Sequence, residues 1–164
     1  MRIALVMIFL AASAFAQNQS AAAAPACGPK DTGLELKLDK SKHALAPPEP
    51  GKARVYFIQD IGRVSCIGGC VKTKIGMDGT WVGGVQHNSY FSISVEPGEH
   101  HMCATTGPMI ALVHLTAEAG KIYYFRTRAF GAENQGLFDF DPIDSDQGQH
   151  LIASYPLSVS RPNP

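Results

Sequence analysis

The feature that most constrains this chain is a series of short apolar segments separated by turn residues at short, even intervals. The segments 89–96 (SYFSISVE) and 109–117 (MIALVHLTA) carry apolar residues at alternate positions, which is the period of a β-strand and not of a helix. The β-branched and aromatic residues that strands favour are frequent in the segment 53–59 (ARVYFIQ). Further segments of this kind lie at 34–38, 99–105, 121–128 and, more briefly, 136–140.

Turn dipeptides connect several of these segments. Asp78-Gly79, between 74–77 and 80–82, predicts a two-residue β-hairpin, because aspartate and glycine tolerate the positive φ angles of such a turn. Pro97-Gly98 joins two later segments, with proline presetting the first turn position and glycine supplying the second. Ala119-Gly120 joins the next two.

One short helix is predicted near the C-terminus. Ser145 can cap its free amide groups, and the acidic residues Asp144 and Asp146 suit the positive end of the helix dipole. The helix continues through 149–154, although Gly148 lowers the helix propensity of this segment.

These elements predict a mainly β fold with one short C-terminal helix. The expected architecture is an antiparallel β-sandwich, immunoglobulin-like or transthyretin-like, or a partly open barrel. Strands do not alternate with long helices, which argues against a parallel α/β sheet. A chain of 164 residues has room for one domain of ordinary size, which we assign to residues 34–160, followed by a tail at 161–164.

The N-terminus has the pattern of a signal peptide over residues 1–16. Arg2 is followed by an apolar run that is shorter than the roughly 18–20 residues needed to cross a bilayer. Ala14-Phe15-Ala16 then matches a signal peptidase site, so we expect cleavage after Ala16 and export to the periplasm or the medium. The distance of Cys27 from the apolar run disfavours a lipoprotein. Residues 17–33 are expected to form a flexible tether.

Charge narrows the range of partners. Lysine and arginine number 14, as do aspartate and glutamate, so the chain has no net attraction to polyanions. The sequence therefore predicts no nucleic-acid partner, and no second segment is long and apolar enough to span a membrane. An envelope protein or a glycan remains as the expected kind of partner.

Several segments, in this order along the chain, resemble those of one bacterial family. They are 27–29, 50–58, 76–83, 89–91, 95–103 and 117–126. The family is known as domain of unknown function 2846, and the resemblance is to its secreted, acidobacterial version. It implies a small β-rich domain of the envelope or the medium with no established activity. Cys66 and Cys70 look like a local addition to the pattern.

The even number of cysteines predicts disulfides in an exported chain. Four cysteines allow three pairings, of which we favour Cys27 with Cys103 and Cys66 with Cys70. The first would join the N-terminal segment to a core strand. The second would close a tight loop around Gly68-Gly69. A redox-active Cys66–Cys70 pair is disfavoured, because such pairs usually lie at a helix N-terminus.

Two weak metal patterns are present, although the sequence predicts no resident metal or cofactor. Zinc would need Cys66 and Cys70 together with an imidazole, and in a strand the side chains of neighbouring histidines point to opposite faces. The candidate imidazoles are His87, His100 and His101. Calcium would use the acidic group Asp139, Asp141, Asp144 and Asp146, but Pro142 and Ile143 interrupt the spacing that a calcium loop needs.

Catalytic motifs are missing from the sequence. There is no Gly-x-Ser-x-Gly element, and the serines and histidines show no spacing specific to a triad. Trp81 and Tyr90, together with Tyr123 and Tyr124, could form an aromatic ligand platform, but ordinary sheet packing explains these residues better. The leading hypothesis is a non-enzymatic binding or structural module of the cell envelope. A metal- or carbohydrate-binding accessory domain is the alternative, and a hydrolase with a dispersed site is a third.

Overall fold

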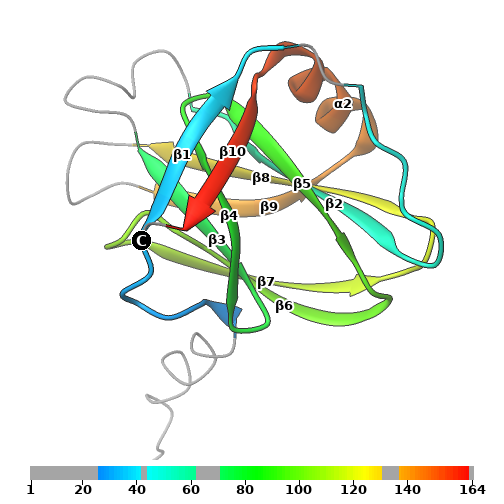
Figure 1. The fold of residues 1–164 in the computed structure, drawn as a ribbon, viewed down its shortest axis with the longest axis horizontal. Coiled ribbons are helices and arrows are strands. Elements are labelled where there is room, and N and C mark those ends of the chain that lie inside the picture. Colours follow the sequence, from blue (N-terminus) through cyan, green and yellow to red (C-terminus); the bar gives the residue numbers. More distant parts are fainter. Residues whose placement is uncertain (1–25, 42–43, 62–70, 131–136, 163–164) are drawn as a thin grey trace, which may run out of the picture.

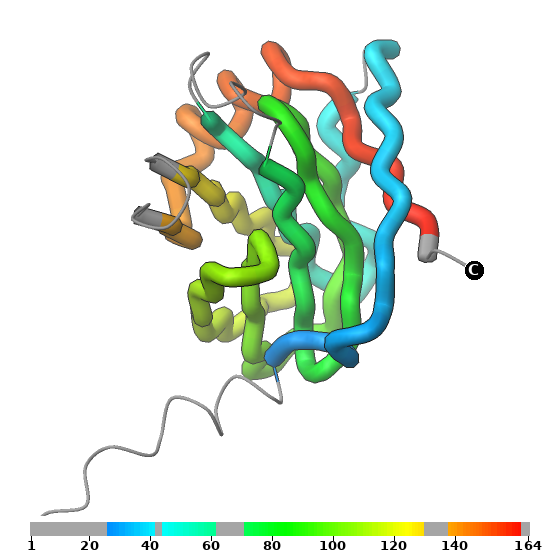
Figure 2. Tube along the Cα trace, turned by 90° about the vertical axis from the view of Figure 1, so that its left-hand side faces the viewer, coloured from blue at the N-terminus to red at the C-terminus, as the bar shows by residue number. Residues whose placement is uncertain are grey.

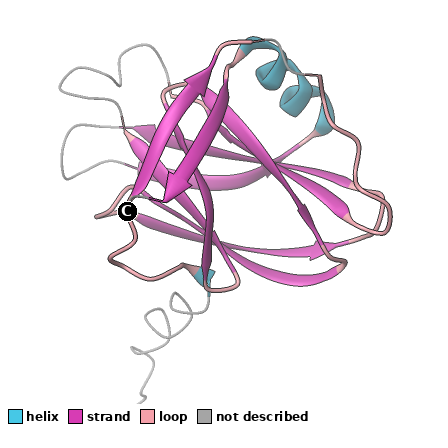
Figure 3. Ribbon diagram, in the orientation of Figure 1, coloured by secondary structure: helices cyan, strands magenta, loops and turns pink. Residues whose placement is uncertain are grey.

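The computed structural model describes residues 26–41, 44–61, 71–130 and 137–162, which form two stacked β-sheets and a helix. Figures 1 and 3 show the two layers of strands, with the helix at one end of the larger sheet. The elements are β1 (Leu34–Asp39), β2 (Ala53–Gln59), β3 (Lys72–Met77), β4 (Thr80–Gln86), β5 (Ser89–Val95), β6 (Gly98–Thr105), β7 (Ile110–Ala117), β8 (Ile122–Phe130), β9 (Leu137–Ile143), α2 (Ser145–Ser154) and β10 (Leu157–Pro162).

The strands divide into a six-stranded sheet, sheet A, and a four-stranded sheet, sheet B. Sheet A has the order β1-β10-β5-β2-β8-β9, and sheet B has the order β4-β3-β6-β7. The described strands leave both sheets open at their edges, so the predicted sandwich is confirmed and the barrel alternative is not found.

Sheet A differs from the prediction because it is mixed. β2 pairs with β8 in parallel, and β5 pairs with β10 in parallel at Tyr90 and Leu157. Parallel neighbours need a long connection, and between β2 and β8 the chain visits sheet B twice. A purely antiparallel arrangement holds for sheet B only.

The Asp78-Gly79 hairpin is confirmed between β3 and β4. The φ angles of Asp78 and Gly79 are 49° and 81°, the positive values that a two-residue hairpin of this type requires. A register shift at Ile75/Gly76 makes a bulge further along the same pair of strands.

The main core lies between the sheets. Phe57 on β2 is fully buried, and its ring lies 5.1 Å from that of Phe91 and 6.4 Å from that of Phe125. The alternate apolar positions of β5 and β7 contribute Phe91, Val95 and Leu115, as the period-two pattern predicted.

A second apolar cluster lies on the outer face of sheet A, under α2. It consists of Tyr56, Ile58, Tyr90, Tyr124 and Ile152. The prediction that Ser145 caps α2 is wrong: Asp144 is the cap, and its carboxylate accepts a hydrogen bond of 2.8 Å from the Gln147 amide. An aspartate can accept this bond as well as a serine can, so the sequence left the position of the cap ambiguous by one residue.

Gly148 in this helix has a packing reason that the sequence did not show. A Cβ at this position would overlap the ring of Tyr124 on β8. The glycine therefore lets α2 lie close to sheet A, and the loss of helix propensity accompanies a tighter contact.

The final strand, β10, turns Ser158 toward the interior of the sandwich and Val159 toward solvent. Ser158 is 4% exposed and donates to the Gly84 carbonyl at 2.8 Å, whereas Val159 is 40% exposed. This inverted pattern hides the strand from sequence analysis, and β10 runs through Arg161 and Pro162, which we expected to be a tail.

Candidate functional site

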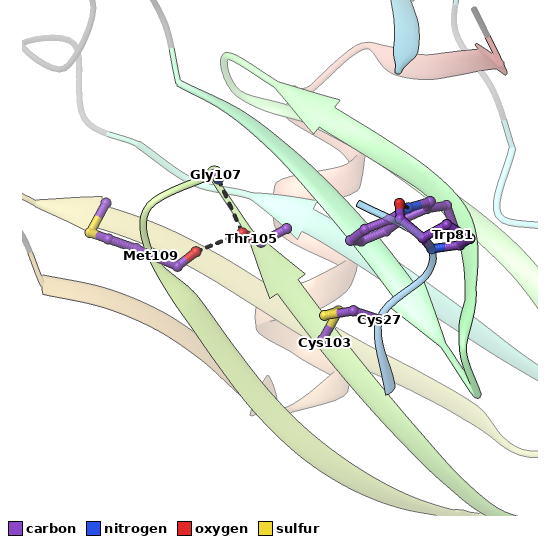
Figure 4. Close-up of a disulfide and its surroundings, with 7 residues drawn as sticks. Cys27, Trp81, Cys103, Thr105, Gly107 and Met109 are labelled. Carbon is purple, nitrogen blue, oxygen red and sulfur yellow. Dashed lines mark hydrogen bonds between the residues drawn. A yellow bond between two sulfur atoms is a disulfide. The ribbon is translucent and has the colours of Figure 1, made fainter. Parts of the chain in front are cut away.

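The N-terminal segment 26–33 lies against the outer face of sheet B, although we expected it to belong to a flexible tether. A disulfide joins Cys27 to Cys103 on β6, with 5.5 Å between the two Cα atoms (Figure 4). Figure 2 shows the segment, in dark blue, running beside the green strands before it continues into β1. The predicted Cys27–Cys103 pair is thus present. Cys66 and Cys70 lie outside the described residues.

Glycine allows the segment to approach the sheet this closely. A Cβ on Gly76 of β3 would lie 2.9 Å from both the Ala26 carbonyl oxygen and the Cys27 Cα. A Cβ at that distance would overlap these backbone atoms, so a side chain at Gly76 would push the segment and its disulfide away from β3.

Trp81 on β4 holds the segment from the other side. Its indole N–H donates to the Pro29 carbonyl at 2.7 Å, and the Lys74 ammonium lies 4.3 Å from the centre of the ring. Lys74 also donates to the Thr32 carbonyl at 3.2 Å. The aromatic ring is therefore engaged by its own chain.

The other aromatic candidate, Tyr90, lies on the opposite side of the sandwich. It is 4% exposed, and its ring centre is 6.3 Å from that of Tyr56 in the cluster under α2. The structure does not bring Trp81 and Tyr90 together, so they do not form one platform.

A pocket of about 280 Å³ opens between the segment and sheet B. Leu34 and Leu36 of β1 form its apolar wall, and Lys72 and Lys74 of β3 supply positive charge. The remaining lining residues are Thr32, Gly33, Thr105, Thr106 and Gly107. Cations and hydroxyl groups beside an apolar wall suit a ligand with an anionic group on an apolar body.

The turn after β6 is held in place by its own hydroxyl group. The Thr105 hydroxyl donates to the Met109 carbonyl at 2.8 Å and accepts a hydrogen bond of 3.0 Å from the Gly107 amide (Figure 4). The rim of the pocket is therefore fixed by side-chain hydrogen bonds at the β6–β7 turn.

The structure does not bring the three candidate histidines of the weak zinc pattern together. His87 is in the turn between β4 and β5, whereas His100 and His101 follow each other on β6. Asp144 and Asp146 lie at the start of α2, over sheet A. Within the described ranges, no group of three or more histidine, cysteine or acidic side chains is placed to hold a metal ion.

His100 is instead part of a polar contact at the end of the core. Its Nδ1 lies 2.6 Å from an Asp78 carboxylate oxygen, and its Nε2 lies 2.8 Å from the Glu96 carbonyl oxygen. Both partners are acceptors, so both ring nitrogens must donate, which requires the charged imidazolium form.

The pKa values of this pair fit that assignment. Burial alone lowers the pKa of His100, but the hydrogen bonds to Asp78 and Glu96 and the charge of Asp78 outweigh it, and the pKa rises above 6.5. Burial likewise acts to raise the pKa of Asp78. The hydrogen bonds from His100 and the His101 amide outweigh it, and the Asp78 pKa falls below 3.8.

His114, which the sequence analysis did not single out, is the partner of His101. The two residues are directly opposite on β7 and β6, and their ring centres are 4.4 Å apart. Only the β6–β7 register could have revealed this pair from the sequence.

No curated protein and no solved structure matches the chain. Among the described residues, no helix is long and apolar enough to cross a bilayer. One family model, described as a protein of unknown function (DUF2846), matches residues 49–137, which extend from the start of the β2 region into β9. This match covers more than half of the sequence and agrees with the resemblance found in its segments. The chain belongs to the DUF2846 family.

Proposed function

We propose that this protein is an exported, non-enzymatic binding module of the cell envelope. The signal-peptide pattern with cleavage after Ala16 supports export to the periplasm or the medium. The Cys27–Cys103 disulfide is compatible with an oxidising compartment and supports the same reading.

The observation that carries the binding role is the pocket beside the disulfide-linked segment. Its wall includes Thr32 and Gly33, which follow Cys27 by a few residues and are held by the same attachment to sheet B. A pocket whose wall is fixed in advance loses less conformational entropy when it binds a ligand.

The lining favours binding over catalysis. The described lining residues provide two ammonium groups and three threonine hydroxyls but no carboxylate or imidazole to act as a base. The Thr105 hydroxyl already donates to Met109. We therefore assign the pocket to a small anionic group, such as a carboxylate on an envelope glycan or on a peptide.

Export is tested by expressing the full chain in a bacterium and measuring the intact mass of the protein from the periplasm and the medium. The expected mass is that of a chain beginning at Gln17, and it is lower than the mass of the reduced chain by two hydrogens for each disulfide. Recovery of the protein only from the cytoplasm, with Met1 still attached, would contradict the export proposal.

Binding is tested by amide chemical-shift mapping with soluble cell-wall glycopeptide fragments and short acidic peptides as probes. Shifts are expected at 32–36, 72–74 and 105–107, and Lys72→Gln should weaken binding by about tenfold or more through loss of a charge-assisted contact. Lys121→Gln, in the β7–β8 turn, is the matched control and should bind like the wild type. Equal affinity of the two variants, or shifts confined to other surfaces, would contradict this location.

A further inference from the structure

The exposed surface of sheet B carries two imidazoles that face each other across neighbouring strands. His101 on β6 pairs with His114 on β7, between the pairs His100–Leu115 and Met102–Val113. Both histidines are exposed, and their ring planes meet at 73° with their centres 4.4 Å apart. The strands thus hold two potential metal ligands side by side.

Cross-strand geometry suits a single shared ion. Side chains directly opposite on one face of an antiparallel pair have Cβ atoms about 4.5–5.5 Å apart. A metal–imidazole bond is about 2.0–2.1 Å long, so two imidazoles on adjacent strands can reach one ion after small ring rotations. The backbone hydrogen bonds of β6 and β7 fix the spacing before the ion arrives.

The surrounding charge favours a cation at this position. One carboxylate oxygen of Asp78 accepts a hydrogen bond of 2.9 Å from the His101 amide. Glu99 lies two residues before His101, on the same face of β6, and is exposed. Because the charged His100 already pairs with Asp78, the Glu99 carboxylate is the negative charge that makes the local field attractive to a divalent ion.

We propose that His101 and His114 together bind one divalent transition-metal ion, with Cu²⁺ bound more tightly than Ni²⁺ or Zn²⁺. Imidazole nitrogen is a good ligand for all three ions, and affinity for such sites peaks at Cu²⁺. Two protein ligands leave the remaining coordination positions to water or to a ligand from outside the chain. His100 takes no part, because both of its ring nitrogens already have partners.

This site is distinct from the zinc site considered from the sequence, which combined Cys66 and Cys70 with one of three histidines, His87, His100 or His101. It is also separate from the proposed pocket, since neither histidine lines that pocket. A failure of metal binding would therefore leave the proposed function unaffected.

The test uses the mature, tag-free chain and Cu²⁺ alone, added as its sulfate in a weakly coordinating buffer. Titration calorimetry should show one site per chain, and electron paramagnetic resonance should show hyperfine coupling to imidazole nitrogens. His101→Gln and His114→Gln should each weaken binding by about tenfold or more, because each removes one arm of a bidentate site. The double variant should bind hardly more weakly than either single variant, since the arms act as a unit.

His150→Gln is the matched control, because His150 is exposed on α2 and lies over the other sheet. It should bind Cu²⁺ as the wild type does. The thermal midpoints of all variants without metal should agree, which shows that they are folded. Wild-type affinity in either the His101 or the His114 variant, or equal weakening by His150→Gln, would overturn the proposal.

Discussion

The two outer faces of this sandwich are covered in different ways. On sheet A, α2 packs through Ile152 against the tyrosine cluster, and the residues before β2 join it where the Tyr56 hydroxyl contacts both backbone groups of Ala46. On sheet B, the segment 26–33 is short and depends on the Cys27–Cys103 disulfide and the hydrogen bond from Trp81. One cover is held by buried aromatic area, and the other by a covalent bond.

The difference follows from how much apolar surface each cover can bury. The ten-residue helix α2 can place one side on the sheet, whereas the segment 26–33 contains one buried apolar side chain, Ala26. Apolar burial stabilises by roughly 25 cal/mol per Å². The burial of one alanine therefore cannot offset the conformational entropy that is lost when such a segment becomes ordered. Both covers lie outside the range 49–137 that matches the family, although Cys103 lies within it.

Removing the disulfide is expected to have the largest effect. Cys27 and Cys103 are 76 residues apart, and closing a loop of that length stabilises by about 4 kcal/mol in the chain-entropy model. The Cys27→Ser/Cys103→Ser variant should lose about this free energy of unfolding in urea. Hydrogen exchange should show residues 26–33 unprotected and α2 unchanged. Equal loss of protection in both covers would show that they are not independent.

Truncating the helix anchor should cost slightly less. Ile152 is 4% exposed within the tyrosine cluster, and Ile152→Ala should lower the free energy of unfolding by about 3 kcal/mol. His150→Ala, an exposed position on the same helix, should change it by less than about 0.5 kcal/mol. If the two variants had equal stability, the apolar contact of Ile152 would not be what holds α2 against sheet A.

Gly148→Ala gives a test in which two effects have opposite signs. Alanine should stabilise an exposed helix by about 1 kcal/mol relative to glycine. Here the new Cβ would overlap the Tyr124 ring, and overpacking costs about 1–3 kcal/mol. We expect a net loss of about 1–2 kcal/mol in urea unfolding, and a gain in stability would show that α2 can move away from sheet A at little cost.

The parts of this fold that the sequence predicted depend on local chemistry. Asp78-Gly79 specifies its hairpin through two adjacent residues, and alternation in β5 and β7 identifies the core face without knowledge of the partner strands. The Cys27–Cys103 disulfide could be predicted because the signal-peptide pattern and the even number of cysteines both favour disulfides.

The parts that were missed depend on contacts between distant residues. β10 turns Ser158 and Ser160 inward because the backbone of Gly84, on the other sheet, supplies their hydrogen-bond partners. The local sequence pattern does not indicate such a contact. The His101–His114 pair requires the register of β6 and β7, and the pocket requires a segment whose position is set by the disulfide. The candidate site is therefore less predictable than the fold.

The smallest expected effect is the pH dependence of the His100–Asp78 contact, which ties the β3–β4 turn to β6 on the side of sheet B. The raised His100 pKa means that its stabilisation is complete below about pH 6.5 and is lost as the pH rises through the folded-state value. The lowered Asp78 pKa means that its stabilisation is present above about pH 4 and is lost as the pH falls through the folded-state value. The contact should therefore stabilise most between about pH 4 and 6.5.

Asp78→Asn tests this effect, because asparagine also tolerates the positive φ of 49°. Since Asp78 is 46% exposed, solvent screening limits the loss to about 1 kcal/mol or less. Urea unfolding should show a larger difference from the wild type at pH 5.5 than at pH 8.5. Glu35→Gln, which removes an exposed pair with Lys37, should show the same small difference at both values. A pH-independent effect of Asp78→Asn would mean that the carboxylate acts only through the His101 amide, and that the charge on His100 contributes nothing to holding the turn.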